Sequence, residues 1–287
     1  MGLGYSAAAY IGGFGERIGR VSGTVRSEAK RQALAARGID AFVFDGQPHP
    51  GVTEAIRAAD AILVSAPPAE LAATTAAMLA PGQTPAVVYL SSLSVYGDHG
   101  GAEIDEDAAL KATSVRGRER IAAEEAWRQF GRASGCPVAI LRLAGIYGPG
   151  RNALITVAKG EARRIVKPGQ VFNRIHVADI AQAIAAAFER RADGVFNGAD
   201  DEPAPPQDVI AYAANLLGVP PPPEMPFEEA KRTMSPMARS FYAESKRALN
   251  RRLKTGLGVT LRYPTYREGL DALFAARDHE SSGEPSA

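Results

Sequence analysis

Short apolar runs alternate with longer stretches of helix-forming residues over the first two thirds of the chain. The runs lie at residues 21–25, 41–44, 61–64, 87–90 and 138–141. Because they are short and mostly β-branched or apolar, they fit strands buried on both faces of a parallel sheet. The segments between them, such as 29–37, 69–78 and 117–133, favour helices. This alternation predicts an α/β fold with a doubly wound parallel sheet.

The remainder of the chain predicts a smaller, mostly helical lobe. Two further short strands are expected at 175–177 and 195–197, with a helix over 178–190. After about residue 200, clustered prolines interrupt the pattern. The elements expected there are helices at 207–217, 226–231, 243–254 and 265–276 and a short strand at 261–263. We therefore expect a sheet domain over 1–200, a second lobe over 201–277 and a disordered polar tail over 278–287.

Composition narrows the class of partner. The 33 basic and 32 acidic residues give a net charge of +1, which offers no broad electrostatic surface for nucleic acid or an anionic membrane. The single cysteine, Cys136, cannot form an intramolecular disulfide, as is usual in a reducing compartment. No apolar run approaches the roughly 20 residues of a membrane span, and the histidines show no ligand spacing. We expect a cytoplasmic protein without a metal, acting on a small-molecule substrate.

Residues 2–7 (GLGYSA) match the glycine pattern of dinucleotide-binding Rossmann folds. The glycines allow a tight turn and close approach of the backbone to a pyrophosphate at the start of a helix. The expected cofactor contacts are Gly2, Gly4, Tyr5, Ser6 and Ala7. The motif ordinarily follows a strand, yet here it begins at Met1. The central first strand is therefore expected to be missing, because the natural protein starts upstream or because this copy is damaged.

The end of the run at 21–25 bears on the choice of cofactor. NAD sites usually carry an acidic residue there, whereas this chain has Arg26 followed by Ser27. A guanidinium suits the 2′-phosphate of NADP, and the hydroxyl can add a hydrogen bond. Lys30 and Arg31 follow one helical turn later. The pattern favours NADP over NAD, the alternative being a solvated basic face.

Two further motifs carry a family resemblance. Residues 91–97 (SSLSVYG) and 141–150 (LRLAGIYGPG) follow the glycine motif in the order found in the extended short-chain dehydrogenase/reductases. Over residues 2–275 the chain resembles the atypical, NAD(P)-dependent epimerase/dehydratase-like branch of that superfamily. The resemblance implies adenine contact by Asp45, passage of Ser65 and Ala66 beside the cofactor, and a catalytic role for Ser92, whose hydroxyl would bind a substrate oxygen. The alternative for Ser92 is a side chain that caps the end of the strand. It also implies a homodimer, and a stripe suited to the interface consists of Ile121, Ala122, Ala126 and Phe130.

The Tyr and Lys on which this family relies are replaced. Arg116 stands at the position of the Tyr and Arg120 at that of the Lys. A guanidinium stays protonated at any working pH, so it cannot act as a general base, although it can bind an anion or stabilise an oxyanion. The alternative is a solvated helix start, with an ion pair such as Arg120 to Glu124.

The substrate side is indicated by residues 147–151 (YGPGR) and 173–180 (NRIHVADI), which resemble the family's cleft motifs. The substrate-contact candidates are Tyr147, Arg151, Asn173, Arg174 and His176. For His176 a buried hydrogen-bonding role is the alternative, and Asp179 is expected to cap the helix that follows. Leu93 and Ser94 replace the Asp-Glu pair of the family's dehydratases, which argues against dehydration.

Two functions of different class remain open. The first is an NAD(P)-dependent oxidoreductase or epimerase acting on a small hydroxyl- or carbonyl-bearing substrate. Its proton would come from Tyr96, from another residue of the following loop such as Asp98 or His99, or from water. The second is a non-catalytic dinucleotide-binding sensor or interaction protein. The retained cleft motifs favour the first function, and the replaced Tyr-Lys pair favours the second.

Overall fold

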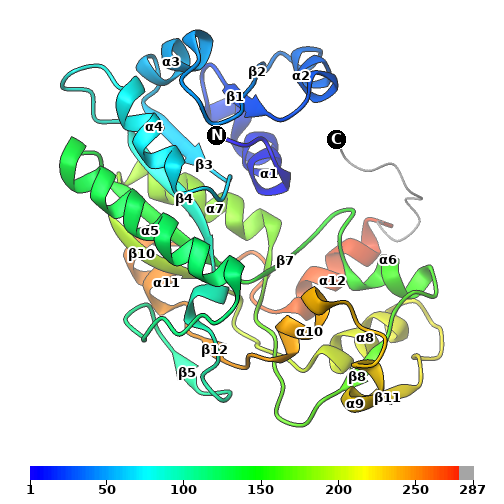
Figure 1. Cartoon of the computed structure of the whole chain (residues 1–287). Helices are drawn as coiled ribbons and strands as arrows, with labels where there is room; N and C mark the ends of the chain where they lie inside the picture. The colour runs from blue at the N-terminus through cyan, green and yellow to red at the C-terminus, as the bar shows by residue number, and fades with distance from the viewer. Residues whose placement is uncertain (278–287) are drawn as a thin grey trace.

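The computed structural model describes residues 1–277, and its strands pair in parallel throughout the named sheets (Figure 1). The main sheet has the order β10-β6-β4-β3, and a separate two-stranded sheet pairs β1 with β2. The bounds are β1 (Ser22–Val25), β2 (Asp40–Val43), β3 (Ala61–Val64), β4 (Ala86–Ser92), β6 (Val138–Leu143) and β10 (Gly194–Gly198). The predicted doubly wound parallel fold is confirmed, with the predicted strands close to their observed positions.

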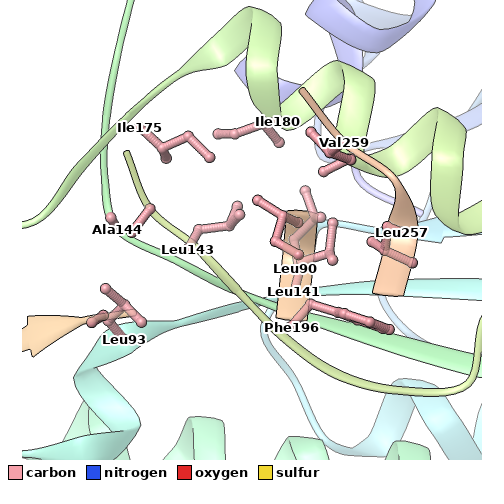
Figure 2. Packing of buried hydrophobic residues seen from close by; sticks show 14 of the residues in the cluster. Leu90, Leu93, Leu141, Leu143, Ala144, Ile175, Ile180, Phe196, Leu257 and Val259 are labelled. Atoms are coloured by element: carbon pink, nitrogen blue, oxygen red, sulfur yellow. The ribbon is translucent and has the colours of Figure 1, made fainter. Parts of the chain in front are cut away.

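Alternate side chains of β4 enter two different cores. Val87 and Tyr89 pack with Trp127 in one apolar cluster, whereas Val88 and Leu90 belong to the cluster on the opposite face. Figure 2 shows the second of these clusters, with Leu90 labelled. Helices α4 (Glu70–Met78) and α5 (Val115–Ser134) supply side chains to the first cluster. Helices α7 (Val177–Glu189) and α11 (Arg251–Leu257) supply the second. Burial on both faces explains why successive residues of β4 are apolar.

The sheet is divided at the place where the sequence predicts a missing central strand. The Met1 ammonium donates to the Leu63 carbonyl of β3, and the Ser65 amide donates to the Met1 carbonyl at 2.9 Å. On the other side, the Leu3 amide donates to the Thr24 carbonyl of β1 at 3.0 Å. Residues 1–3 thus bridge the two sheets at one end, and a cavity of about 580 Å³ separates β1 from β3 beyond them.

Two helices flank the N-terminal strands, and one begins the chain. Helix α1 (Tyr5–Phe14) packs along α7, while α2 (Glu28–Ala35) connects β1 to β2 and α3 (Pro50–Arg57) precedes β3 (Figure 1). Ser27 accepts a hydrogen bond from the Lys30 amide and so caps α2. The start of α1 therefore lies at the end of the sheet where a dinucleotide is expected.

The second lobe has its own core, formed between β7 (Gly145–Tyr147), α6 (Ala153–Ala158), α8 (Pro206–Leu216) and α12 (Tyr266–Ala275). Strand β7 pairs in parallel with β9 (Arg174–His176). The remaining short elements are β5 (Glu103–Ile104), β8 (Arg164–Val166), β11 (Glu224–Pro226), α9 (Phe227–Ala230), α10 (Pro236–Tyr242) and β12 (Arg247–Ala248). The predicted helices at 207–217, 226–231 and 265–276 correspond to α8, α9 and α12.

Two predicted elements of this lobe are wrong. The helix expected at 243–254 forms only near its end, as α11, because the preceding residues pair as β12 and bury the Lys246 ammonium against the Gly97 carbonyl at 2.6 Å. Residues 261–263 form no strand. Instead, the amides of Arg262 and Tyr263 donate to the Asp179 carboxylate at 2.6 and 3.1 Å.

That contact also corrects the role expected for Asp179. The N-cap of α7 is His176, whose Nδ1 accepts a hydrogen bond from the Ala178 amide at 3.1 Å. Asp179 lies in the first turn and ties the helix to the segment before α12. The predicted tail at 278–287 lies outside the described residues.

The stripe expected to serve a dimer is not one continuous surface. Phe130 is only 5% exposed, because it packs with Trp127 beneath the sheet, while Ala122 is exposed. The homodimer and the domain boundaries stay predictions. Within residues 1–277 no helix is both long and apolar enough to cross a membrane.

Candidate functional site

A cavity of about 1080 Å³, here called the main cavity, joins the start of α1 to the end of β4, the start of α5 and the second lobe. It collects most of the predicted site residues from segments far apart in the sequence. The predicted residues that line it are Gly4, Tyr5, Ser6, Ser65, Ser92, Arg116, Arg120, Tyr147, Arg151, Asn173 and Arg174. Gly2 and Ala7 instead line the smaller cavity between β1 and β3.

The start of α1 has the features of a dinucleotide site. Gly4 is the N-cap and has no side chain with which to cap the helix, so the helix start is open to an anionic group. Gly2 has a φ of +84°, a conformation that favours glycine. A Cβ atom there would lie 2.9 Å from the Ser65 Oγ atom. Glycine is therefore required at position 2 by the turn itself, and the residues present fit a pyrophosphate.

The residues predicted to contact the adenosine part lie on the neighbouring sheet. Arg26 is exposed directly after β1, and no described acidic group forms an ion pair with it. Arg31 adds no free charge, because its guanidinium binds the Glu28 carboxylate. Asp45 is exposed and accepts a hydrogen bond from the Gln47 amide at 3.0 Å. Arg26 and Lys30 are thus the cations of this region that form no ion pair within the described residues.

Ser92 ends β4 at the edge of the main cavity. Its Oγ atom accepts a hydrogen bond from the Ser94 amide at 3.2 Å, which leaves the hydroxyl hydrogen available to a ligand. Helix α5 starts close by, with Ser114 as its N-cap. A Cβ atom on Gly117 would lie 3.0 Å from the Ser94 carbonyl oxygen, so glycine permits this close approach.

The two arginines at the start of α5 differ in their surroundings. Arg116 is exposed, and its guanidinium lies 3.5 Å from the Met237 sulfur of α10. Arg120 donates to the Leu90 carbonyl at 2.8 Å and to the Tyr89 hydroxyl at 3.0 Å. The alternative ion pair from Arg120 to Glu124 is not formed. The structure therefore places both guanidinium groups on the main cavity without a carboxylate partner among residues 1–277.

Glu124 belongs instead to a buried network that sequence analysis missed. Its carboxylate binds the Arg142 guanidinium at 2.8 Å and the Arg128 guanidinium at 2.9 Å. Arg142 also donates to the Tyr96 hydroxyl at 2.8 Å, and this hydroxyl donates to the Asn197 side-chain oxygen at 2.7 Å. The signal that could have revealed the network is a lone arginine inside the apolar strand at 138–143.

The three loop residues proposed as proton sources are all bound elsewhere in the structure, and Tyr96 is bound within this network. Tyr96 is fully buried, and burial raises the pKa of its hydroxyl. The Asp98 carboxylate accepts hydrogen bonds from the Ser245 and Gly100 amides, which lower its pKa. His99 contacts the Ala109 carbonyl at 3.1 Å. None of these three residues lines the main cavity.

His176 and Asn173 both hold the fold together. His176 is 4% exposed and does not line the main cavity, and burial lowers its pKa to about 4. Its ring lies between Tyr147 and Tyr263. Asn173 does line the cavity, but its amide donates to the Lys246 carbonyl at 2.9 Å and accepts from the Ala248 amide at 2.8 Å. The Asn173 amide and the His176 Nδ1 atom are thus already engaged by the protein, whereas the buried Nε2 atom of His176 has no hydrogen-bond partner within residues 1–277.

Comparison with known proteins decides the family. Residues 24–199 match the model of the NAD dependent epimerase/dehydratase family. The chain belongs to this family. The family-wide fold agrees with the parallel sheet and with the dinucleotide features at the start of α1. The protein is thus of the NAD(P)-binding oxidoreductase or epimerase type.

Individual relatives add detail without fixing a substrate. A 3-diazoavenalumate denitrifying reductase from Streptomyces is 31% identical over 137 residues. That match covers 46% of this chain and 45% of the relative, so it spans about half of that protein. A functionally unknown conserved protein from Silicibacter pomeroyi shares 43% identity, with a TM-score of 0.81 over 96% of this chain and 97% of the other.

A more distant structure shows the fold alone. The human epimerase family protein SDR39U1, determined with NADPH, has a TM-score of 0.63 at 20% identity. The match covers 90% of this chain and 99% of the human chain. The shared fold therefore extends through the second lobe.

Proposed function

We propose that the protein binds NADP(H) in preference to NAD(H) and reduces a small carbonyl-bearing substrate, or oxidises the corresponding alcohol, in the main cavity. The observation that carries the proposal is the meeting of an uncapped helix start, the Ser92 hydroxyl and the α5 arginines in one cavity. The human neighbour was determined with NADPH and the Streptomyces relative is named a reductase, and both agree with this direction.

The chain's own groups suit the stabilisation of a negative oxygen. When bound, the dinucleotide supplies the hydride chemistry. The Ser92 hydroxyl can donate a hydrogen bond to the substrate oxygen, since its lone pairs already accept from the Ser94 amide. The Arg120 guanidinium, which is held against β4 by its bonds to the Leu90 carbonyl and the Tyr89 hydroxyl, adds positive charge that lowers the energy of a developing oxyanion. Because a guanidinium is a very weak acid, the proton that completes the alcohol comes from solvent.

The choice of NADP(H) rests on Arg26. Its exposed guanidinium follows β1, at the position where NAD sites carry an acid. A 2′-phosphate there would gain charge-assisted hydrogen bonds that a ribose hydroxyl cannot provide. NAD(H) has no 2′-phosphate, so the Arg26 guanidinium would contribute little to its binding.

The test is a titration with NADPH and NADH, followed by turnover of aldehydes and ketones measured as loss of nicotinamide absorbance. We expect tighter binding of NADPH and slow reduction of at least one carbonyl compound. Tighter binding of NADH would contradict the proposed cofactor preference. Tight NADPH binding without any turnover would contradict the proposed catalysis and support the non-catalytic alternative.

A further inference from the structure

The main cavity carries a strong excess of positive charge. Its lining includes the guanidinium groups of Arg116, Arg120, Arg151 and Arg174. None of the four forms an ion pair within residues 1–277. The acid on the cavity wall, Glu244, is itself bound to Lys246 at 2.7 Å. Four cations therefore line one cavity without an ion pair to any carboxylate of the described residues.

Arg174 shows that this charge is held in place by the fold. Its guanidinium donates to the carbonyls of Phe172 and Ala204 at 3.0 and 3.2 Å. These are backbone acceptors, so they fix the direction of the side chain without cancelling its charge. Burial lowers the pKa of Arg174, while Asp200 acts on it electrostatically from beyond ion-pair distance. An anionic ligand would relieve the cost of keeping this cation partly out of water.

The same end of the cavity is also apolar. Helix α10 places Met237 and Phe241 on the cavity wall, and these side chains are 49% and 60% exposed. Phe172 and Tyr242 lie behind them, with ring centroids 5.1 Å apart. When a ligand covers large apolar side chains that are exposed on a cavity wall, the free energy of the complex falls, which favours binding. The Arg116 guanidinium lies directly against the Met237 sulfur, so the cationic and apolar surfaces adjoin.

The side-chain amide and the carboxylate at this end of the cavity are already engaged by the protein. The Asn173 amide is engaged on both sides by backbone groups, and the Glu244 carboxylate is paired. A sugar needs hydrogen-bond acceptors for its hydroxyl hydrogens, whereas guanidinium groups can only donate. The lining is thus better matched to an anion with an apolar body.

We propose that the substrate of the main cavity is an apolar carboxylate of about the size of an aryl alkanoic acid. Its carboxylate binds the guanidinium of Arg116, with Arg174 lining the same cavity, and its apolar body covers Met237 and Phe241. This inference rests on the proposed function for the reacting group, which lies toward Ser92. It differs from that function by naming the charge and polarity of the substrate.

The experiment compares 4-phenylbutyrate with 4-phenylbutanamide, which have the same carbon skeleton and differ in charge. Binding to the NADPH-loaded protein is measured by calorimetry, with UDP-glucose as a hydroxyl-rich, anionic comparison. We expect the acid to bind at least tenfold more tightly than the amide and more tightly than UDP-glucose. Arg116→Gln should abolish the preference for the acid, since it removes the exposed guanidinium while retaining a polar side chain.

Arg118→Gln is the matched control. Arg118 lies on the same helix, is exposed and does not line the main cavity, so this variant should keep the full preference for the acid. Met237→Ser combined with Phe241→Ser should weaken the acid and the amide by the same factor, because only the apolar surface changes. A preference lost equally in the Arg116 and Arg118 variants would overturn the proposed carboxylate site.

Two other results would also overturn the inference: equal binding of acid and amide by the wild type, or tighter binding of UDP-glucose. The proposed function has a separate readout, the NADPH titration of the same proteins. The acid and amide titrations are also carried out without the dinucleotide. Failure to bind NADPH would therefore contradict the proposed function but would leave the carboxylate proposal open to its own test. Normal NADPH binding without discrimination between acid and amide would defeat the carboxylate proposal alone.

Discussion

Arginine occupies two contrasting environments in this molecule: buried on a strand of the main sheet, and on the wall of the main cavity. Arg142 of β6 is 2% exposed, and its guanidinium binds a carboxylate, a hydroxyl and a backbone carbonyl. Arg116 at the start of α5 is exposed and contacts a methionine sulfur. Both side chains carry the same charge, yet only the first is neutralised by the fold.

The difference separates a structural from a functional use of the residue. A buried charge must be compensated by the protein itself, since water cannot reach it. A charge on a cavity wall can remain uncompensated because solvent stabilises it until a ligand binds. We therefore expect Arg142 to govern stability and the cavity arginines to govern binding, and the predictions below test this division in order of decreasing effect.

Arg142→Leu should lower the free energy of unfolding by about 3–5 kcal/mol, because it leaves the buried Glu124 carboxylate with only the partly exposed Arg128 as its cationic partner. Urea denaturation followed by circular dichroism measures the change. Arg116→Gln serves as the control and should stay within about 0.5 kcal/mol of the wild type. Equal destabilisation by both substitutions would show that the two environments do not differ as described.

Arg116→Tyr combined with Arg120→Lys should raise kcat/KM for carbonyl reduction by about 100-fold, because a tyrosine hydroxyl can transfer a proton and a neighbouring lysine lowers its pKa. The readout is the initial rate of NADPH oxidation with a fixed ketone. Arg118→Tyr on the same helix is the control. If the wild type is active and the double variant is inactive, the arginines participate in the reaction themselves.

Arg26→Asp should weaken NADPH binding by about 1–3 kcal/mol, the scale of lost charge-assisted hydrogen bonds. Binding of NADH should change little, since it has no 2′-phosphate. Fluorescence titration with each dinucleotide measures both affinities. An equal loss for the two dinucleotides would mean that Arg26 does not recognise the phosphate and belongs to an ordinary solvated surface.

His176 should contribute a smaller, pH-dependent difference. Burial holds its pKa at about 4, below the ordinary value of 6.5, so the unfolded chain binds more protons between these values. Stability from this group therefore rises with pH across that window and is lost as the pH falls. From linkage, we expect about 1 kcal/mol between pH 7 and pH 5.5. The same denaturation series on His176→Asn, which retains a capping side chain, should lack this component; an unchanged pH slope would refute the assignment.

Sequence patterns predicted local structure well where one physical requirement dominated. The apolar runs marked the parallel strands because burial on both faces demands apolar residues throughout, and residues 2–7 predicted the glycine turn before α1. The helix expected at 243–254 failed, because tertiary pairing of β12 and the buried Lys246 ammonium overrode local helix propensity. A strand as short as β12, which pairs with a segment far away in the sequence, is too short to show a periodic pattern of apolar residues.

The candidate site was only partly predictable for a related reason. Sequence spacing indicated which segments would meet, and the main cavity gathers most of those residues. It could not show which polar groups would already have partners. Tyr96 was a reasonable proton source by position but is bound to Arg142 and Asn197, and the Asn173 amide is engaged by β12. Whether a polar group already has its hydrogen-bond partners depends on contacts between distant segments, which a single sequence does not reveal.

The bridge formed by residues 1–3 has a consequence for local unfolding. Strands β1 and β2 enclose a small apolar cluster of Val25, Leu34, Ile39 and Ala41, apart from the larger cores. Thr24 joins this unit to the bridge through the amides of Gly2 and Leu3. Amides of residues 22–43 should therefore exchange with deuterium sooner than those of β4 and β6. A dinucleotide spanning Gly4 and Arg26 would fasten the unit to the rest of the molecule, so cofactor binding would slow exchange there most.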